Sequence, residues 1–106
     1  MDEYVVVLIT APSIETGKAL ARAILDARLA ACVNILPAVN SMYVWEGEIY
    51  DEGEVLLIVK TRANLLDGGL IPIVEKLHPY KTPEIIALPI VKGARKYLEW
   101  IGEVTS

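Results

Sequence analysis

The chain has 106 residues, of which ten are Lys or Arg and 14 are Asp or Glu, so its formal net charge is −4. There is no run of basic residues, and the aromatic residues are not interleaved with basic ones, so the composition disfavours nucleic-acid binding. A single cysteine, Cys32, excludes an internal disulfide and any zinc site built on paired cysteines. We expect one domain over residues 1–106 in a cytoplasmic protein. No membrane segment is expected, because the apolar run at 4–10 is too short to span a bilayer.

The first predicted elements are a strand and a helix. Residues 4–10, YVVVLIT, form a β-branched apolar run that is typical of a buried strand. Ala11 and Pro12 break this run, and Ser13 is well placed to cap the helix that follows. Apolar residues then recur at helical spacing, which predicts a helix over about 13–28.

A long hairpin is expected in the middle of the chain. Its first strand starts over residues 31–35, is interrupted at Pro37 and resumes with alternating polarity over 41–45. The turn is placed at residues 51–53, Asp-Glu-Gly, and a turn at 46–47 is the alternative. Gly47 is then expected to mark a bulge or bend.

The remaining elements are one strand, one helix, another strand and a last helix. The third strand is predicted over residues 54–61, and a helical pattern follows over 62–78. Two glycines weaken the start of this helix, so Pro72 is a candidate first residue of a shorter one. A fourth strand is predicted over 84–91 and a closing helix over 94–104.

This order of elements indicates an α+β fold. A βαββαβ sequence with an added C-terminal helix is the ferredoxin-like arrangement, which contains a four-stranded antiparallel sheet. Right-handed crossovers place the first two helices on the same face of that sheet.

Three of the predicted strands are apolar on both sides. The segments 5–9 (VVVLI), 54–60 (EVLLIVK) and 84–91 (EIIALPIV) are apolar at consecutive positions apart from any charged residue at an end, and such strands need cover on both faces of the sheet. The first two helices cover one face only. The other face is covered either by the C-terminal helix or by another copy of the chain, with the 32–61 hairpin as a reaching arm, and both can hold at once.

Five segments together carry a resemblance to a known family. They are LARAILDARLAACVNILP (20–37), SMYVWEGEI (41–49), VLLIVKT (55–61), HPYKTPEIIALPI (78–90) and YLEWI (97–101). In this order they resemble the CutA family of divalent-cation-tolerance proteins. The resemblance implies a PII-like homotrimer of ferredoxin-like subunits that acts without catalysis in tolerance to copper and other divalent cations.

The similarity to PII signalling proteins also supplies an alternative function. Those proteins bind small effectors in clefts between subunits, so the alternative is a small-molecule-binding or signalling trimer. An anionic ligand is the expectation, with Lys60 to attract it. The candidate cleft residues are Tyr43, Trp45, Lys60, His78, Tyr80 and Glu84.

His78 is the only histidine and the only metal-ligand candidate. Its position before Pro79 first indicates a structural role at a helix end, and weak contact with copper or another divalent cation is secondary. Copper-binding relatives use a first-strand cysteine and adjacent histidines, where this chain has Ile9 and Leu77. We therefore expect any metal to be weakly bound and not required for folding. Cys32 is expected to be a small buried hydrophobe.

The other candidates each have a plain structural alternative. Tyr43, Trp45 and Tyr80 are typical of interface packing as well as of a ligand cage. Glu84 is expected to pair with Lys60 or Lys81, and the acidic residues over 46–54 are expected to be a solvated arm tip. A His78–Glu84 acid–base pair is the only catalytic arrangement that the residue types permit, and no nucleophile motif supports it, so we expect a protein without enzymatic activity.

Overall fold

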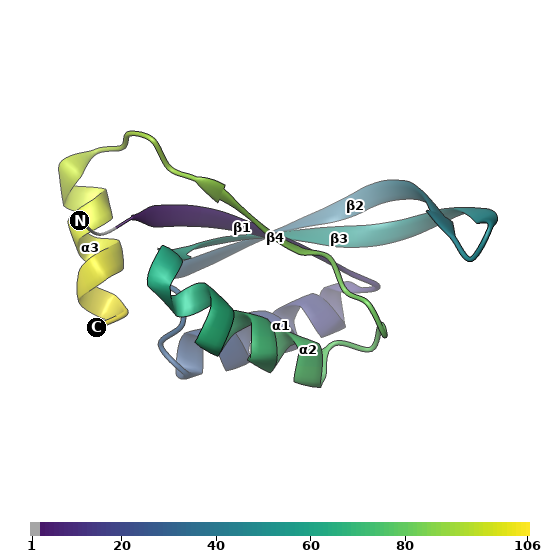
Figure 1. The fold of residues 1–106 in the computed structure, drawn as a ribbon, viewed down its shortest axis with the longest axis horizontal. Coiled ribbons are helices and arrows are strands. Elements are labelled where there is room, and N and C mark those ends of the chain that lie inside the picture. Colours follow the sequence, from purple (N-terminus) through teal and green to yellow (C-terminus); the bar gives the residue numbers. More distant parts are fainter. Residues whose placement is uncertain (1–2) are drawn as a thin grey trace.

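The computed structural model describes residues 3–106 and has the predicted ferredoxin-like α+β fold (Figure 1). Four strands and three helices follow one another in the expected order. The elements are β1 (Tyr4–Ala11), α1 (Ile14–Asp26), β2 (Cys32–Trp45), β3 (Glu48–Arg62), a short 3-10 turn (Ala63–Leu65), a π-helical turn (Leu66–Leu70), α2 (Ile71–Leu77), β4 (Ile85–Pro89) and α3 (Arg95–Val104). No helix within residues 3–106 is long and apolar enough to cross a membrane.

The four strands form one antiparallel sheet in the order β2-β3-β1-β4. The sheet centres on β1, where Val7 lies opposite Val59 of β3 and opposite Ala87 of β4. Alternate residues of β1 are buried, because successive side chains of a strand point to opposite faces. β2 and β4 are the two edge strands of the sheet.

Helices α1 and α2 lie on the same face of the sheet, as predicted (Figure 1). Ser13 caps α1, since its extended backbone lets its hydroxyl accept a hydrogen bond from the Thr16 amide at 3.1 Å. Gly17 allows α1 to approach β3 closely: a Cβ at this position would lie 3.2 Å from the Val55 side chain.

The core lies between these two helices and the sheet. Its side chains come from alternate positions of β1 and β3 and from the inner faces of the helical segments. They include Val7, Ile9, Leu20, Ile24, Leu57, Val59, Leu70 and Val74, each at most 2% exposed. Burial of each such side chain stabilises the fold by roughly 1.5–3 kcal/mol. This face of the sheet is therefore covered by α1 and α2.

The hairpin differs from the leading prediction. The turn is at Glu46 and Gly47, which was the alternative, and residues 51–53 lie inside β3. Glu46 and Gly47 have φ values of 50° and 81°, and a two-residue hairpin turn of this type needs positive φ at both positions. The Asp-Glu-Gly segment therefore has residue types that favour a turn, but its pairing with β2 holds it extended.

Pro37 also does not divide β2 into two strands. The register between β2 and β3 shifts between Leu36 and Val39, and Ala38 has a φ of 63°, so the segment is a β-bulge. β2 continues through this bulge as a single 14-residue strand.

The second helix is the shorter of the two versions considered. It begins at Ile71 with Pro72 in its first turn, and the preceding residues form the 3-10 and π-helical turns. Gly69 packs there against Leu29, whose side chain would lie 2.6 Å from a Cβ at this position. β4 is also shorter than the predicted 84–91.

Helix α3 covers only one end of the sheet (Figure 1). It is attached through Arg62, whose guanidinium donates to the Thr105 hydroxyl at 2.8 Å and to the Thr105 carbonyl at 2.7 Å. The open face, defined as the sheet face away from α1 and α2, therefore keeps apolar side chains at its surface: Ile86 is 51% and Leu88 50% exposed. The sequence predicts that strands with two apolar faces need cover on both, and the open face is the one that still lacks cover.

Replacing Leu57 with Ala tests the position of the core. Leu57 is fully buried, so we expect a loss of about 2–5 kcal/mol in the free energy of unfolding, measured by chemical denaturation at fixed protein concentration. Leu77→Ala is the matched control, since Leu77 is 48% exposed and should cost less than about 1 kcal/mol. Equal losses for the two variants would contradict this assignment of the core.

Candidate functional site

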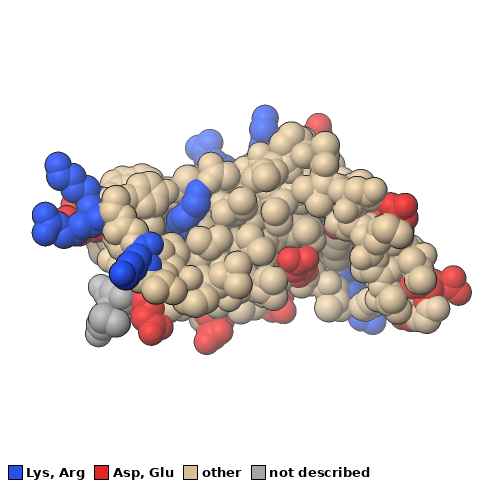
Figure 2. All heavy atoms as spheres, turned by 90° about the horizontal axis from the view of Figure 1, so that it is seen from above, with Lys and Arg blue, Asp and Glu red and all other residues tan. Residues whose placement is uncertain are grey.

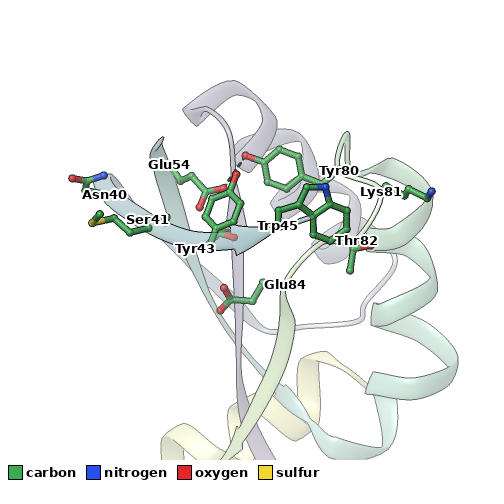
Figure 3. A pocket seen from close by; sticks show the side chains of 11 residues that line it. Asn40, Ser41, Tyr43, Trp45, Glu54, Tyr80, Lys81, Thr82 and Glu84 are labelled. Carbon is green, nitrogen blue, oxygen red and sulfur yellow. Dashed lines mark hydrogen bonds between the residues drawn. The ribbon is translucent and has the colours of Figure 1, made fainter. Parts of the chain in front are cut away.

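A cavity of about 590 Å³ opens where the hairpin leaves the sheet (Figure 3). Residues 40–43 and Trp45 of β2 line one side of it, and residues 80–82 with Glu84 line the other. Thr10, near the end of β1, and Glu54 complete the lining. The cavity thus joins three segments that are far apart in the sequence.

The position of the cavity follows from the different lengths of the strands. β1 pairs with β3 only as far as the Ala11–Val55 pair, whereas β2 and β3 continue to pair with each other up to Trp45 and Glu48. The arm, defined as residues 39–54, therefore projects beyond the sheet (Figure 1). Glu54 is the residue at the junction and is only 6% exposed.

His78 fixes the loop that forms the second side of the cavity. Its imidazole is 6% exposed, Nδ1 accepts a hydrogen bond from the Tyr80 amide at 3.1 Å, and Nε2 lies 2.7 Å from the Thr10 carbonyl oxygen. Since Nδ1 accepts, the proton is on Nε2, which donates to Thr10. His78 thereby ties the loop after α2 to β1. This is a structural role, although the partner is a carbonyl of β1 and not the end of the helix, where the sequence places it.

These hydrogen bonds bear directly on the metal hypothesis. Both ring nitrogens of His78 have protein partners, so a metal would first have to displace the Tyr80 amide from Nδ1. Within residues 3–106, no three His, Cys, Asp or Glu side chains come together as a metal site. The metal contact considered for His78 from the sequence would therefore carry this added cost, which disfavours His78 as a ligand.

Tyr80 and Glu54 form the central polar contact of the cavity. The Tyr80 hydroxyl donates to Glu54 Oε2 at 2.8 Å. Burial and this hydrogen bond together raise the pKa of Tyr80 well above its usual value, because both favour the neutral phenol. The only ion pair within residues 3–106 joins Arg22 to Asp26, so no cationic side chain there neutralises Glu54.

Two more aromatic residues reach the cavity from the arm. Tyr43 donates to Glu52 Oε1 at 2.5 Å and stacks on Tyr50 with ring centroids 5.4 Å apart. The hydrogen bond to Glu52 is the main cause that raises the pKa of Tyr43 to about 12. Figure 3 shows Tyr43, Trp45 and Tyr80 gathered around the cavity, so the structure brings together the three predicted aromatic residues.

Lys60 does not reach this cavity. It lies six positions along β3 from Glu54, which is about 20 Å in an extended strand. Its ammonium contacts Asn34 Oδ1 and lies 3.8 Å from the sulfur of Cys32, which is half-buried rather than buried. Within a single chain, Lys60 and the aromatic residues therefore do not line the same cavity. The cleft between subunits that was expected to contain both stays a prediction.

Glu84 lines the cavity but does not form the expected ion pairs. It is exposed, and within residues 3–106 it pairs with neither Lys60 nor Lys81. Lys81 also lines the cavity, although its ammonium extends away from the aromatic rings (Figure 3). Glu54 is the functional candidate that the sequence analysis missed, because it was grouped with the solvated acidic residues of the arm.

Comparison with known proteins gives one consistent result. The family model described as "CutA1 divalent ion tolerance protein" matches residues 5–104. The chain is 50% identical to the "Divalent-cation tolerance protein CutA" of Thermus thermophilus over 94% of this chain and 96% of that protein. It is 48% identical to the chloroplastic "Protein CutA" of Arabidopsis thaliana, which it matches over 95% of its own length but only 55% of the plant protein.

The solved structures agree with the sequence comparison. The crystal structure of CutA1 from Oryza sativa superposes with a TM-score of 0.94 at 49% sequence identity. The superposition covers 98% of this chain and 94% of the rice chain. The likeness therefore extends over the whole ferredoxin-like unit and includes the arm.

The pKa of Tyr43 reports the negative charge around the arm. Glu52→Gln removes the charged acceptor that stabilises the neutral phenol, so the pKa of Tyr43 should fall from about 12 toward the ordinary value of about 10. Carbon-13 NMR of labelled tyrosine side chains measures this pKa. Glu48→Gln is the control on the same strand and should leave it unchanged. An unaltered pKa in Glu52→Gln would contradict the hydrogen bond.

Proposed function

Because the chain belongs to the CutA1 divalent ion tolerance family, we propose that it functions in tolerance to divalent cations, copper among them, as a non-enzymatic homotrimer. The observation that carries the proposal is the continuous match over residues 5–104. It is supported by the 50% identity to a Thermus thermophilus protein named for divalent-cation tolerance.

A role without catalysis is supported by the state of the polar residues in the cavity. A general base needs a free nitrogen or oxygen within reach of its substrate, but both ring nitrogens of His78 are already hydrogen-bonded. Glu84 is exposed and makes no hydrogen bond with His78 among the contacts within residues 3–106. The acid–base pair considered from the sequence is therefore not assembled.

The homotrimer is supported by the open face of the sheet. Leu8, Leu56 and Ile58 are only half-buried there, and Ile86 and Leu88 are about half exposed. Seen from above the sheet, most of the surface belongs to uncharged residues, with charged side chains mainly toward the rim (Figure 2). A second copy of the chain offers a matching apolar surface, and the family resemblance gives the number of copies as three.

The arm supplies the means of contact between copies. It carries Met42, Val44 and Ile49 at 69%, 70% and 75% exposure, so three large apolar side chains lie open on one short segment, which is typical of an interaction surface. β2 is also an edge strand, whose unpaired backbone groups are free to contact another chain. In the proposed trimer, the arm of one protomer packs on its neighbour and buries these side chains.

Ile86→Asp tests the proposed trimer. A carboxylate at this position would have to be buried in the interface, so we expect the variant to sediment at a lower mass than the wild-type protein at equal concentration. Leu77→Asp is the control, because Leu77 has similar exposure but lies in α2 on the opposite side of the sheet. If Ile86→Asp keeps the wild-type mass, the open face is not the interface.

Metal binding is proposed to be weak and independent of His78. Calorimetric titration with copper(II) or zinc(II) should give dissociation constants on the order of 1 mM for both the wild-type protein and His78→Ala. The reason is that the ring nitrogens of His78 are occupied and that residues 3–106 hold no preformed group of three ligands. Thermal unfolding confirms that the variant is folded. Micromolar binding that His78→Ala abolishes would contradict this proposal and make His78 a ligand.

The second candidate function is a PII-like trimer that binds a small molecule. The cavity of about 590 Å³ favours it, since ligand pockets of such size combine aromatic walls with a few fixed polar groups. In the trimer the cavity would lie at the rim of the covered face, where the arm meets a neighbouring protomer. Failure of every compound in a broad thermal-shift screen to stabilise the protein would count against this function.

A further inference from the structure

The most unusual group in the cavity is the carboxylate of Glu54. Only 6% of the surface of Glu54 is exposed, yet no Lys, Arg or His within residues 3–106 forms an ion pair with it. A buried charge is normally paired, because removal from water costs several kcal/mol. Glu54 therefore lacks the cationic partner that a buried carboxylate normally has.

One oxygen of Glu54 is available to a ligand. Oε2 accepts the hydrogen bond from Tyr80, whereas Oε1 has no hydrogen-bond donor among the residues described. No fully buried side-chain oxygen or nitrogen within residues 3–106 lacks a partner, so Oε1 keeps some exposed surface. Glu54 lines the cavity, which places this oxygen within reach of a ligand there.

The surrounding side chains add to the preference for positive charge. Glu84 is a second carboxylate on the opposite side, and the one lysine of the lining, Lys81, extends away from the rings (Figure 3). Tyr43, Trp45 and Tyr80 present aromatic rings, whose faces attract cations within about 6 Å. Both tyrosines are neutral at physiological pH, because the ordinary pKa of a phenol is about 10. Burial at Tyr80 and the hydrogen bond to Glu52 at Tyr43 raise the pKa further.

We propose that this cavity binds a small organic cation bearing an ammonium or guanidinium group, with Glu54 as its main anchor. The N–H groups of such a ligand donate to Glu54 Oε1, and its carbon chain lies against Trp45 and Tyr43. The inference deepens the second candidate function and rests on it, because it names the ligand class of that cavity. It does not depend on metal tolerance.

Two other ligand classes fit the cavity less well. An anion would meet Glu54 and Glu84 without the help of Lys60, which lies at the far end of β3. An inorganic divalent cation needs several oxygen or nitrogen ligands at short distances, and residues 3–106 offer no group of three such side chains. An organic cation needs only one or two carboxylates and apolar walls.

The contacts that hold the site are already in place. His78 ties Tyr80 to Thr10, and Tyr80 in turn holds Glu54 Oε2, so the position of the free oxygen is fixed before a ligand arrives. Such preorganisation lowers the entropic cost of binding. Glu54 is thus held for a ligand by the same loop that His78 anchors.

Three probes that share a four-carbon chain test the proposal: 1,4-diaminobutane, 1,4-butanediol and succinate, titrated into the wild-type oligomer by calorimetry. We expect saturable binding of the diamine at dissociation constants on the order of 1 mM or tighter, and no binding of the diol or of succinate. Glu54→Gln keeps the shape and the Tyr80 contact and should weaken diamine binding at least about tenfold. Glu99→Gln, the same charge change on α3, should leave it unaltered.

A second variant tests the aromatic wall of the cavity. Because Trp45 lies in the arm that is proposed to pack on a neighbouring protomer, light scattering of this variant must first give the wild-type mass. Trp45 is 41% exposed near the tip of the arm, so Trp45→Ala spares the core and should still weaken diamine binding several-fold. Equal diamine affinity in the wild-type protein and Glu54→Gln would overturn the proposal. So would tighter, Glu54-dependent binding of magnesium or zinc.

The outcomes also separate this proposal from the function on which it rests. Binding of succinate in place of the diamine overturns the organic-cation proposal but leaves a small-molecule-binding function standing. If none of the probes binds, the proposal is overturned, and this includes the case in which a neighbouring protomer fills the cavity. A negative result in the broad thermal-shift screen would then count against the small-molecule-binding function as well.

Discussion

One-sided cover of the sheet is the constraint on which the rest of the structure depends. Because side chains alternate along β1 and β3, one set, including Val7 and Leu57, is sealed beneath α1 and α2. The other set, including Leu8 and Ile58, lies on the open face and is only half-buried. Helix α3 covers just one end of this face, so a single chain leaves apolar surface without a partner (Figure 1).

The unequal lengths of the strands determine where a ligand site can form. β3 has 15 residues, but its pairing with β1 ends at Val55, so the remaining part extends with β2 as the arm. Glu54 lies at this junction, where the loop anchored by His78 comes close enough to bury it. Backbone pairing and one histidine therefore create a polar, aromatic cavity at the end of the sheet opposite to Lys60.

The elements with strong local signals could be predicted from the sequence. The buried strand β1, the Ser13 cap and the ferredoxin-like order are examples, since each depends on nearby residues. The sequence predicts the hairpin turn at residues 51–53, because the local turn preference of Gly53 is strong. In the structure the turn is at 46–47, since strand pairing across the arm overrides that preference.

The candidate site was only partly predictable for a similar reason. Tyr43, Trp45, Tyr80 and Glu84 do line one cavity. Glu54 is one of several acidic residues in the hairpin, and only its burial by a loop distant in sequence distinguishes it from the others.

The proposed assembly depends on the open face being covered by further copies of the chain. Multi-angle light scattering of the wild-type protein tests this most directly: a mass three times the 11.6 kDa of the chain is predicted, and a mass of 11.6 kDa at all concentrations would contradict it.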